Sequence, residues 1–224
     1  AVRGGARELR QVTALVAELL GDSACDARTL ACVATVARQG GTVDLASPAA
    51  DALVLLLRER GTVVTPTLAT LETMFTTPPG TLPLAVAPIA ERLPPIVRAS
   101  VRGGGLPVTS PAERRRHAAS FAAMQRLVKR LYDAEVPLGV GSGGEGAWML
   151  HRELELQAQA GIPNPDVLAQ ATLGAARLVG RDSVEGRVAP GMRADFAIVD
   201  GDPTQHMAML RRTTLVVKDG VVLR

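Results

Sequence analysis

The sequence predicts an α/β fold in which a parallel sheet or barrel is followed by a small C-terminal sheet. Three observations lead to this prediction. Several segments repeat apolar residues at helical spacing, short β-branched stretches separate those segments, and the pattern changes to strand–turn–strand near residue 183. With 224 residues, of which 47% are hydrophobic, the chain is long enough to bury a sizeable core.

The first part of the chain is expected to alternate helices with short strands. Residues 8–20 and 29–39 have helical apolar spacing, and glycines follow both segments. Ser47 followed by Pro48 predicts the N-cap and first turn of a helix that extends through residue 60. The intervening stretches predict strands at 22–26, 42–46 and 62–67, the last one running into a loop.

The second part contains a long irregular insert. Residues 76–111 are rich in proline and glycine and read as a lid or substrate loop, because the alternation of helices and strands continues on both sides. Ser110 opens a predicted helix over 111–134 through a capping box. A strand over 136–141 and a glycine-rich loop follow, then helices over 151–160 and 165–180. Residues 183–224 predict strands joined by tight turns.

Composition excludes two function classes. Basic residues are scattered and aromatic residues make up only 2% of the chain, so no nucleic-acid surface is expected. The longest uncharged segment, 73–90, is broken by prolines and is shorter than the roughly 20 residues of a membrane span. No secretory signal is recognisable, so a cytoplasmic location is expected. Cys25 and Cys32 could form one disulfide, although reduced thiols are the default there.

Several segments carry a family resemblance when they are taken in order. Residues 136–144, 150–180, 185–203 and 216–224 together resemble the amidohydrolase superfamily, in particular imidazolonepropionase-like and related cyclic-amide or dipeptide hydrolases. Residues 58–70 are similar to the seventh barrel strand of that family. The resemblance implies a partial (βα)8 TIM barrel of the metal-dependent hydrolase type over 1–182 and part of a small composite β-sandwich over 183–224. It also implies hydrolysis of carbon–nitrogen bonds by metal-activated water.

The metal-ligand positions of the family are replaced in this sequence. Cys25 falls near the histidine of strand 5, Leu45 follows Asp44 at the histidine of strand 6, and Gly143 stands at the aspartate of strand 8. Leu45 and Gly143 have no ligand atoms, and one cysteine thiolate does not make a catalytic zinc site. No metal site and no cofactor are therefore expected in this chain, although the family uses zinc or another divalent metal.

Other polar residues are expected near the strand ends, and each has a structural alternative. Glu145 could replace the missing carboxylate or be a solvated loop residue, and His151 could contact a pocket or support the helix start. Asp44 favours a structural hydrogen bond. Ser142 would need a histidine and an acid to act as a nucleophile. The candidate site thus comprises Cys25, Asp44, Thr67, Ser142, Gly143, Glu145 and His151. His117 and His206 are expected to be exposed.

About four βα units leave open sheet edges, and three outcomes follow. The chain could be the C-terminal part of a longer polypeptide or pair with an N-terminal half-barrel partner. It could form a homo-oligomer in which two half-barrels close one another. Its N-terminal residues could also pack across the open side. The leading functional hypothesis is a degenerate amidohydrolase. The alternatives are a non-catalytic binding or partner subunit and a metal-independent enzyme that binds a small molecule in the barrel pocket.

Overall fold

A computed structural model describes residues 5–21, 25–26, 29–144 and 146–223. The helices are α1 (Thr13–Leu20), α2 (Leu30–Gln39), α3 (Pro48–Glu59), α4 (Leu68–Thr76), α5 (Pro95–Ser100), α6 (Pro111–Asp133), α7 (Ala147–Gln159), α8 (Asn164–Ala169) and α9 (Ala175–Leu178). The strands are β1 (Glu8–Arg10), β2 (Val63–Thr65), β3 (Phe196–Val199), β4 (Thr213–Lys218) and β5 (Val221–Val222). Short 3-10 helices cover Gly40–Thr42, Ala87–Arg92, Val101–Gly103 and Met207–Arg211, and a π-helical turn covers Gln170–Gly174.

A short parallel sheet lies at the centre of the first part of the chain. β1 pairs with β2 in parallel, with Leu9 opposite Val64. On its other side Val64 donates to the carbonyl oxygen of Pro137 at 2.9 Å and accepts from the amide of Gly139 at 2.9 Å. Residues 137–139 therefore form a third parallel segment, and β2 lies between it and β1.

Two expected strands are not found in this sheet among the residues that the structure describes. The predicted strand over 42–46 is wrong, because the chain forms a 3-10 helix at Gly40–Thr42 and then a turn in which Ser47 donates to the carbonyl oxygen of Asp44. Of the predicted strand over 22–26, residues 22–24 lie outside the described residues and 25–26 are not in a strand. β1 takes the place beside β2 instead. The predicted helix over 8–20 is wrong at its start for the same reason, since α1 begins only after Gln11, whose φ is 67°.

The helices with capping signals agree with the sequence. The Ser47 hydroxyl accepts from the amide of Ala50 at 3.3 Å at the start of α3, and the Ser110 hydroxyl accepts from the amide of Glu113 at 3.1 Å at the start of α6. Two helices differ from expectation. α4 occupies a segment predicted as a loop, and α7 begins before residue 151.

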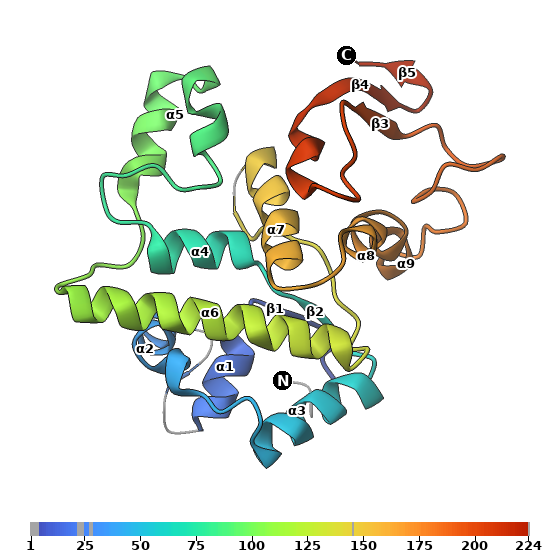
Figure 1. Cartoon of the computed structure of the whole chain (residues 1–224). Coiled ribbons are helices and arrows are strands. Elements are labelled where there is room, and N and C mark those ends of the chain that lie inside the picture. The colour runs from blue at the N-terminus through green and yellow to red at the C-terminus, as the bar shows by residue number, and fades with distance from the viewer. Residues whose placement is uncertain (1–4, 22–24, 27–28, 145, 224) are drawn as a thin grey trace.

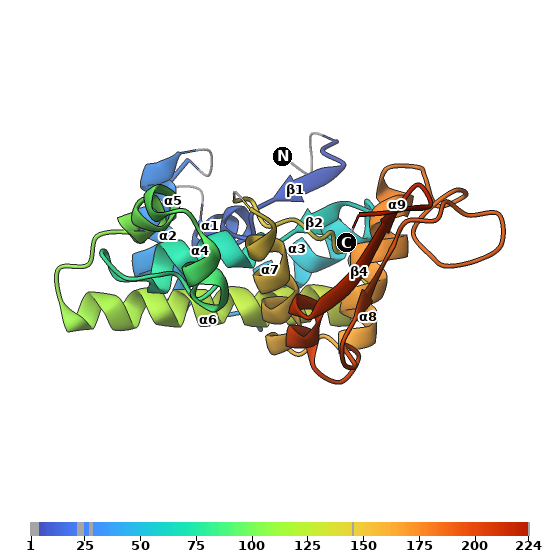
Figure 2. The same ribbon diagram turned by 90° about the horizontal axis from the view of Figure 1, so that it is seen from above.

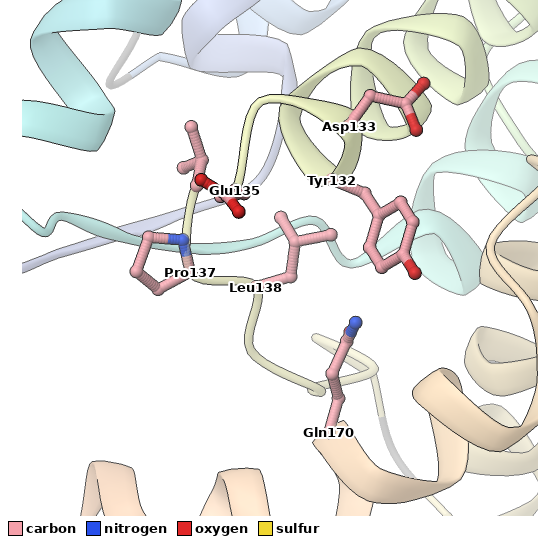
Figure 3. Close-up of a pocket in the computed structure, with 7 residues that line it drawn as sticks. Tyr132, Asp133, Glu135, Pro137, Leu138 and Gln170 are labelled. Atoms are coloured by element: carbon pink, nitrogen blue, oxygen red, sulfur yellow. The ribbon is translucent and has the colours of Figure 1, made fainter.

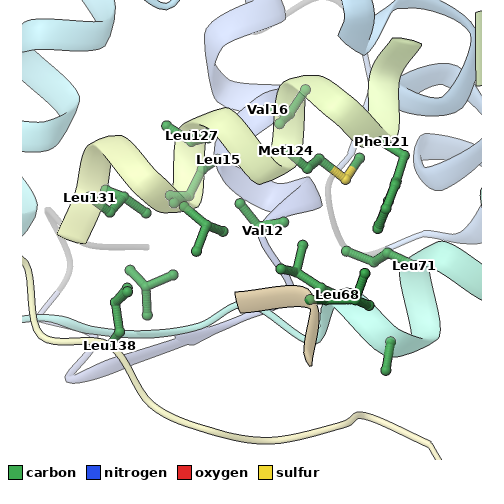
Figure 4. Packing of buried hydrophobic residues seen from close by; sticks show 14 of the residues in the cluster. Val12, Leu15, Val16, Leu68, Leu71, Phe121, Met124, Leu127, Leu131 and Leu138 are labelled. Carbon is green, nitrogen blue, oxygen red and sulfur yellow. The ribbon is translucent and has the colours of Figure 1, made fainter. Parts of the chain in front are cut away.

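α6 organises the core and runs across the middle of the molecule (Figure 1). Its buried face carries Met124, Leu127 and Leu131, each with no exposed surface. These residues share one apolar cluster with α1, α4 and the third parallel segment (Figure 4), including Val12, Leu15, Val16, Leu68, Leu71, Phe121 and Leu138. Full burial of each large aliphatic side chain contributes about 1.5–3 kcal/mol, so this cluster is the main stabilising feature of the first part.

Three side chains differ from what the sequence predicted, namely His117 and the two cysteines. His117 was predicted to be exposed, but it lies on the buried face of α6, where it is 1% exposed and its ring is 6.2 Å from that of Phe75. The arginines that precede it led to the prediction of an exposed side chain, although His117 falls on the apolar face of the helix. Cys25 and Cys32 were expected to be reduced, but they are joined by a disulfide because the start of α2 brings their Cα atoms within 5.0 Å.

The C-terminal residues form a separate antiparallel sheet. β3 pairs with β4 and β4 with β5, so the strand order follows the sequence. This sheet lies at the opposite end of the molecule from α5 in both views (Figures 1 and 2). Within the described ranges, no helix is both long enough and apolar enough to cross a membrane.

Candidate functional site at the strand ends

The carboxyl ends of β2 and of the third parallel segment meet at one point. Thr67 follows β2 and Gly143 follows the third segment, and both have left-handed backbones with φ of 55° and 65°. The Thr70 hydroxyl donates to the carbonyl oxygen of Ser142 at 2.7 Å. A Cβ atom added to Gly143 would lie 3.1 Å from Cβ and 3.2 Å from Cγ2 of Thr67. Of the candidate site residues, Thr67, Ser142 and Gly143 thus lie together at the strand ends.

Thr67 is an unusual residue at this junction. It is 4% exposed, and its hydroxyl oxygen has no hydrogen-bond partner in the described part of the chain. A left-handed backbone is uncommon for a β-branched residue and costs about 1–2 kcal/mol. Thr67 also precedes α4 without capping it through its own side chain.

Glu153 of α7 supplies the missing cap of α4. Its Oε2 atom accepts from the amide of Ala69 at 2.8 Å, and its Oε1 atom accepts from Nε2 of Gln157 at 3.2 Å. The residue is completely buried, and this burial raises the pKa of Glu153 to about 7, although its hydrogen bonds act in the opposite direction. A carboxylate is favourable at a helix N-terminus, so Glu153 positions α4 from the neighbouring helix.

A chain of ion pairs fixes the rest of α7. Two donors of Arg152, Nε and Nη2, reach Glu72 of α4 at 2.8 and 2.6 Å, and its Nη1 reaches Glu155 at 2.9 Å. Glu155 also accepts from Arg211 at 2.7 Å. Burial would raise the pKa of Glu155, but its hydrogen bonds to Arg211 and Arg152 outweigh burial and hold the pKa below its usual value. The network joins α4, α7 and the 3-10 helix Met207–Arg211.

His151 lies at the edge of this network. Its Nδ1 atom is buried without a hydrogen-bond partner among the described residues. Burial lowers the pKa of His151, and the positive charge of Arg211 lowers it further, while Glu155 opposes both. The imidazole is therefore mainly neutral at pH 7. Arg211 and Glu155 are the charged groups that act on His151.

The other predicted site residues lie elsewhere or form local hydrogen bonds. The Ser142 hydroxyl donates to the carbonyl oxygen of Gly144 at 3.2 Å within its own loop. The Asp44 carboxylate accepts from the amide of Ala46 at 2.9 Å and stabilises the turn before α3. Cys25 is half of the disulfide. Glu145 lies outside the described residues.

Glu153 was not among the residues predicted for the site, although the sequence carries a signal for it. Glu153 falls on the helical stripe shared by Met149 and Leu156, at spacings of four and three residues. A carboxylate on an otherwise apolar stripe indicates a buried hydrogen-bonded acid.

The residues present do not fit the divalent metal that the family resemblance implies. In the parts of the chain that the structure describes, no three His, Cys, Asp or Glu side chains are placed to hold a metal ion. Leu45 lies in the turn before α3, and Gly143 offers no side chain. No hydrolytic step through a metal is therefore derived from these residues.

A sequence profile described as amidohydrolase family matches residues 95–223. An amidohydrolase crystal structure is 25% identical with a TM-score of 0.54, covering 95% of this chain and 47% of that one. A putative prolidase from Bifidobacterium longum is 16% identical with a TM-score of 0.56, covering 99% and 56%. The A. niger ochratoxinase is 14% identical with a TM-score of 0.59, covering 100% and 38%.

These comparisons place the fold among barrel hydrolases. The chain spans about half the length of the solved structures that it resembles, or less. No curated protein sequence matches it at a significant level.

Proposed function

Because the chain belongs to the amidohydrolase family, we propose that it descends from enzymes that hydrolyse carbon–nitrogen bonds and no longer builds their metal centre from its own residues. In this proposal the chain is a pseudoenzyme. It acts as a binding or partner subunit and not as a self-contained hydrolase.

The observation that carries the proposal is the packing around Gly143. This residue stands where the family resemblance places the aspartate of strand 8. The backbone of Gly143 is left-handed, and a Cβ atom added to it would lie 3.1 Å from Cβ of Thr67. An aspartate side chain would therefore strain this junction. The junction is packed around a residue without a side chain, which supports an adaptation to the loss of the aspartate.

The scaffold that positions the strand ends is nevertheless retained. Glu153 caps α4, and the ion pairs of Arg152 connect α4 with α7. Breaking a buried ion pair by removing one partner costs about 3–5 kcal/mol, so such a network is strongly held once formed. Strand ends that keep their supporting contacts but offer no metal ligands support a role in binding a ligand or a partner.

The proposal is tested by assaying hydrolysis with the full chain. Dipeptides, N-acyl amino acids and cyclic amides would be offered after incubation with zinc or manganese, and again with a chelator. An active metal-dependent amidohydrolase serves as the positive control. We expect no turnover above the protein-free rate in either condition. Turnover abolished by the chelator would show a rebuilt metal centre, and chelator-insensitive turnover would show a metal-independent enzyme. Either result overturns the proposal.

A further inference from the structure

The first edge of the parallel sheet is the outer side of β1. The amide of Val63 donates to the carbonyl oxygen of Arg7 at 2.9 Å, and the amide of Gln11 donates to that of Thr65 at 3.0 Å. Alternate residues of a parallel strand face opposite neighbours. The backbone groups of Glu8 and Arg10 therefore point away from β2 and form an edge with which no described strand pairs.

The second edge is the outer side of residues 136–140. Pro137 and Gly139 make the hydrogen bonds to Val64, so the backbone groups of Leu138 and Val140 face the other way. Within the described chain, these two amides and carbonyls have no hydrogen-bond partner. Leu138 is only 8% exposed, and unpaired backbone groups in such a setting are unfavourable unless another strand pairs with them.

A pocket of about 540 Å³ opens beside this second edge. Residues 136–138 form one wall, Tyr132 at the end of α6 forms another, and Gln170 projects from the π-helical turn toward Leu138 and Tyr132 (Figure 3). The Tyr132 hydroxyl donates to Asp166, which fixes that wall. The Oε1 atom of Gln170 is buried without a partner among the described residues. Space and an unused hydrogen-bond acceptor thus lie along the open edge.

We propose that a second copy of this chain occupies this edge. β1 of each copy pairs in parallel with residues 136–140 of the other, so that one two-fold axis satisfies both open edges and gives a closed six-stranded parallel sheet. This inference deepens the proposed partner role by naming the partner and its docking strand.

Chain length and charge both favour a second copy. The alignment covers 95% of this chain and 47% of the amidohydrolase structure, so two copies supply about the length of that protein. Parallel pairing also brings the start of β1 beside the start of the 136–140 segment. The exposed Arg7 of one copy then lies near the exposed Glu135 of the other, whose carboxylate also accepts from Arg58 of its own copy at 2.6 Å.

Light scattering with size-exclusion chromatography tests the pairing across protein concentrations. We expect a particle with twice the 23.4 kDa mass of the chain. Arg10→Pro and Val140→Pro each remove an outward-facing amide that the single chain does not use in its own sheet. Each dimer contains two altered edges, so the dissociation constant of the dimer should rise about tenfold or more. Arg10→Ala and Val140→Ala keep the amide and are the matched controls, for which dimerisation should persist.

Circular dichroism would show whether a proline variant fails to fold. In that case, hydrogen exchange in the unaltered chain still tests the pairing. In the unaltered chain, the amides of Leu138 and Val140 should exchange more slowly as protein concentration rises. A monomer at every concentration, a dimer unaffected in folded proline variants, or concentration-independent exchange at both amides would each overturn the pairing. A dimer that hydrolyses amides would refute the proposed function and leave the pairing intact.

Discussion

The buried carboxyl group of Glu153 leads to a quantitative prediction for Glu153→Gln. A carboxyl group whose pKa is higher in the folded than in the unfolded chain binds its proton more tightly when folded. Its contribution to the free energy of unfolding is therefore greatest at low pH and falls as the pH rises from about 4.5 to about 7. The difference of about 2.5 units corresponds to about 3 kcal/mol.

The substitution removes this titration and preserves the local geometry. The new amide oxygen can still accept from the amide of Ala69, and its NH₂ group can donate to Gln157 Oε1. That oxygen has no partner in the described structure, so rotation of the Gln157 amide would bring it to the new NH₂ group and give up the 3.5 Å contact of Gln157 Nε2 with the carbonyl oxygen of Gly139. The unfolding free energy of Glu153→Gln relative to the unaltered chain should therefore rise by about 3 kcal/mol between pH 4 and pH 8.

The assay is urea unfolding followed by circular dichroism at several pH values. Titrating histidines are common to both proteins and cancel in the difference. Glu59→Gln is the control, because Glu59 is exposed at the end of α3, and its difference from the unaltered chain should stay flat. A flat difference for Glu153→Gln as well would refute the assignment of Glu153 as a buried, proton-binding cap.

Three further predictions concern the junction, the buried histidine and the ion-pair network. Gly143→Asp should destabilise the chain by about 2–4 kcal/mol and its control Gly180→Asp by about 1 kcal/mol. Both glycines have a positive φ, but only Gly143 has neighbouring atoms within 4 Å of an added Cβ. Chemical unfolding of both variants measures the two losses. Burial lowers the pKa of His117, so the stability of His117→Leu relative to the unaltered chain should rise as the pH falls below 6.5; thermal unfolding of both proteins against pH measures this difference. Arg211→Ala should cost about 1–3 kcal/mol and increase amide exchange in the C-terminal sheet, because it leaves Glu155 with only Arg152.

Each of these predictions has an opposing result. Equal losses of unfolding free energy for the two glycine variants would show that Thr67 can move to make room for a side chain at Gly143. Equal acid sensitivity with and without His117 would show that its imidazole is protonated without cost. Unchanged exchange in β3–β5 after Arg211→Ala would show that the ion pair does not hold that sheet.

The sequence predicts the helices better than the sheet. Ser47–Pro48 and Ser110 mark helix starts through local hydrogen bonds, so their signals do not depend on distant residues. β1 has only three residues and is defined by its pairing with β2, 55 positions away in the register Glu8↔Val63. Such non-local pairing overrides the helical spacing of the segment, which led to the wrong expectation for residues 8–10.

The candidate site was predictable only where the chain itself brings residues together. Gly143 and Thr67 follow adjacent parallel strands, so their meeting could be inferred. The burial of His117 could not, because charged neighbours on α6 mask an apolar face that becomes clear only when α4 packs beside it. The disulfide was left as one of two alternatives, since spacing alone does not fix the distance between two cysteines.

The most direct test of the central claim is the zinc content of the chain. Protein purified without chelators, offered zinc and freed of excess would be measured by elemental mass spectrometry. The replacement of family ligands by Leu45 and Gly143 predicts a zinc-to-chain ratio near zero. A ratio near one would contradict the account, because it would mean that other residues or a second copy have rebuilt the metal centre.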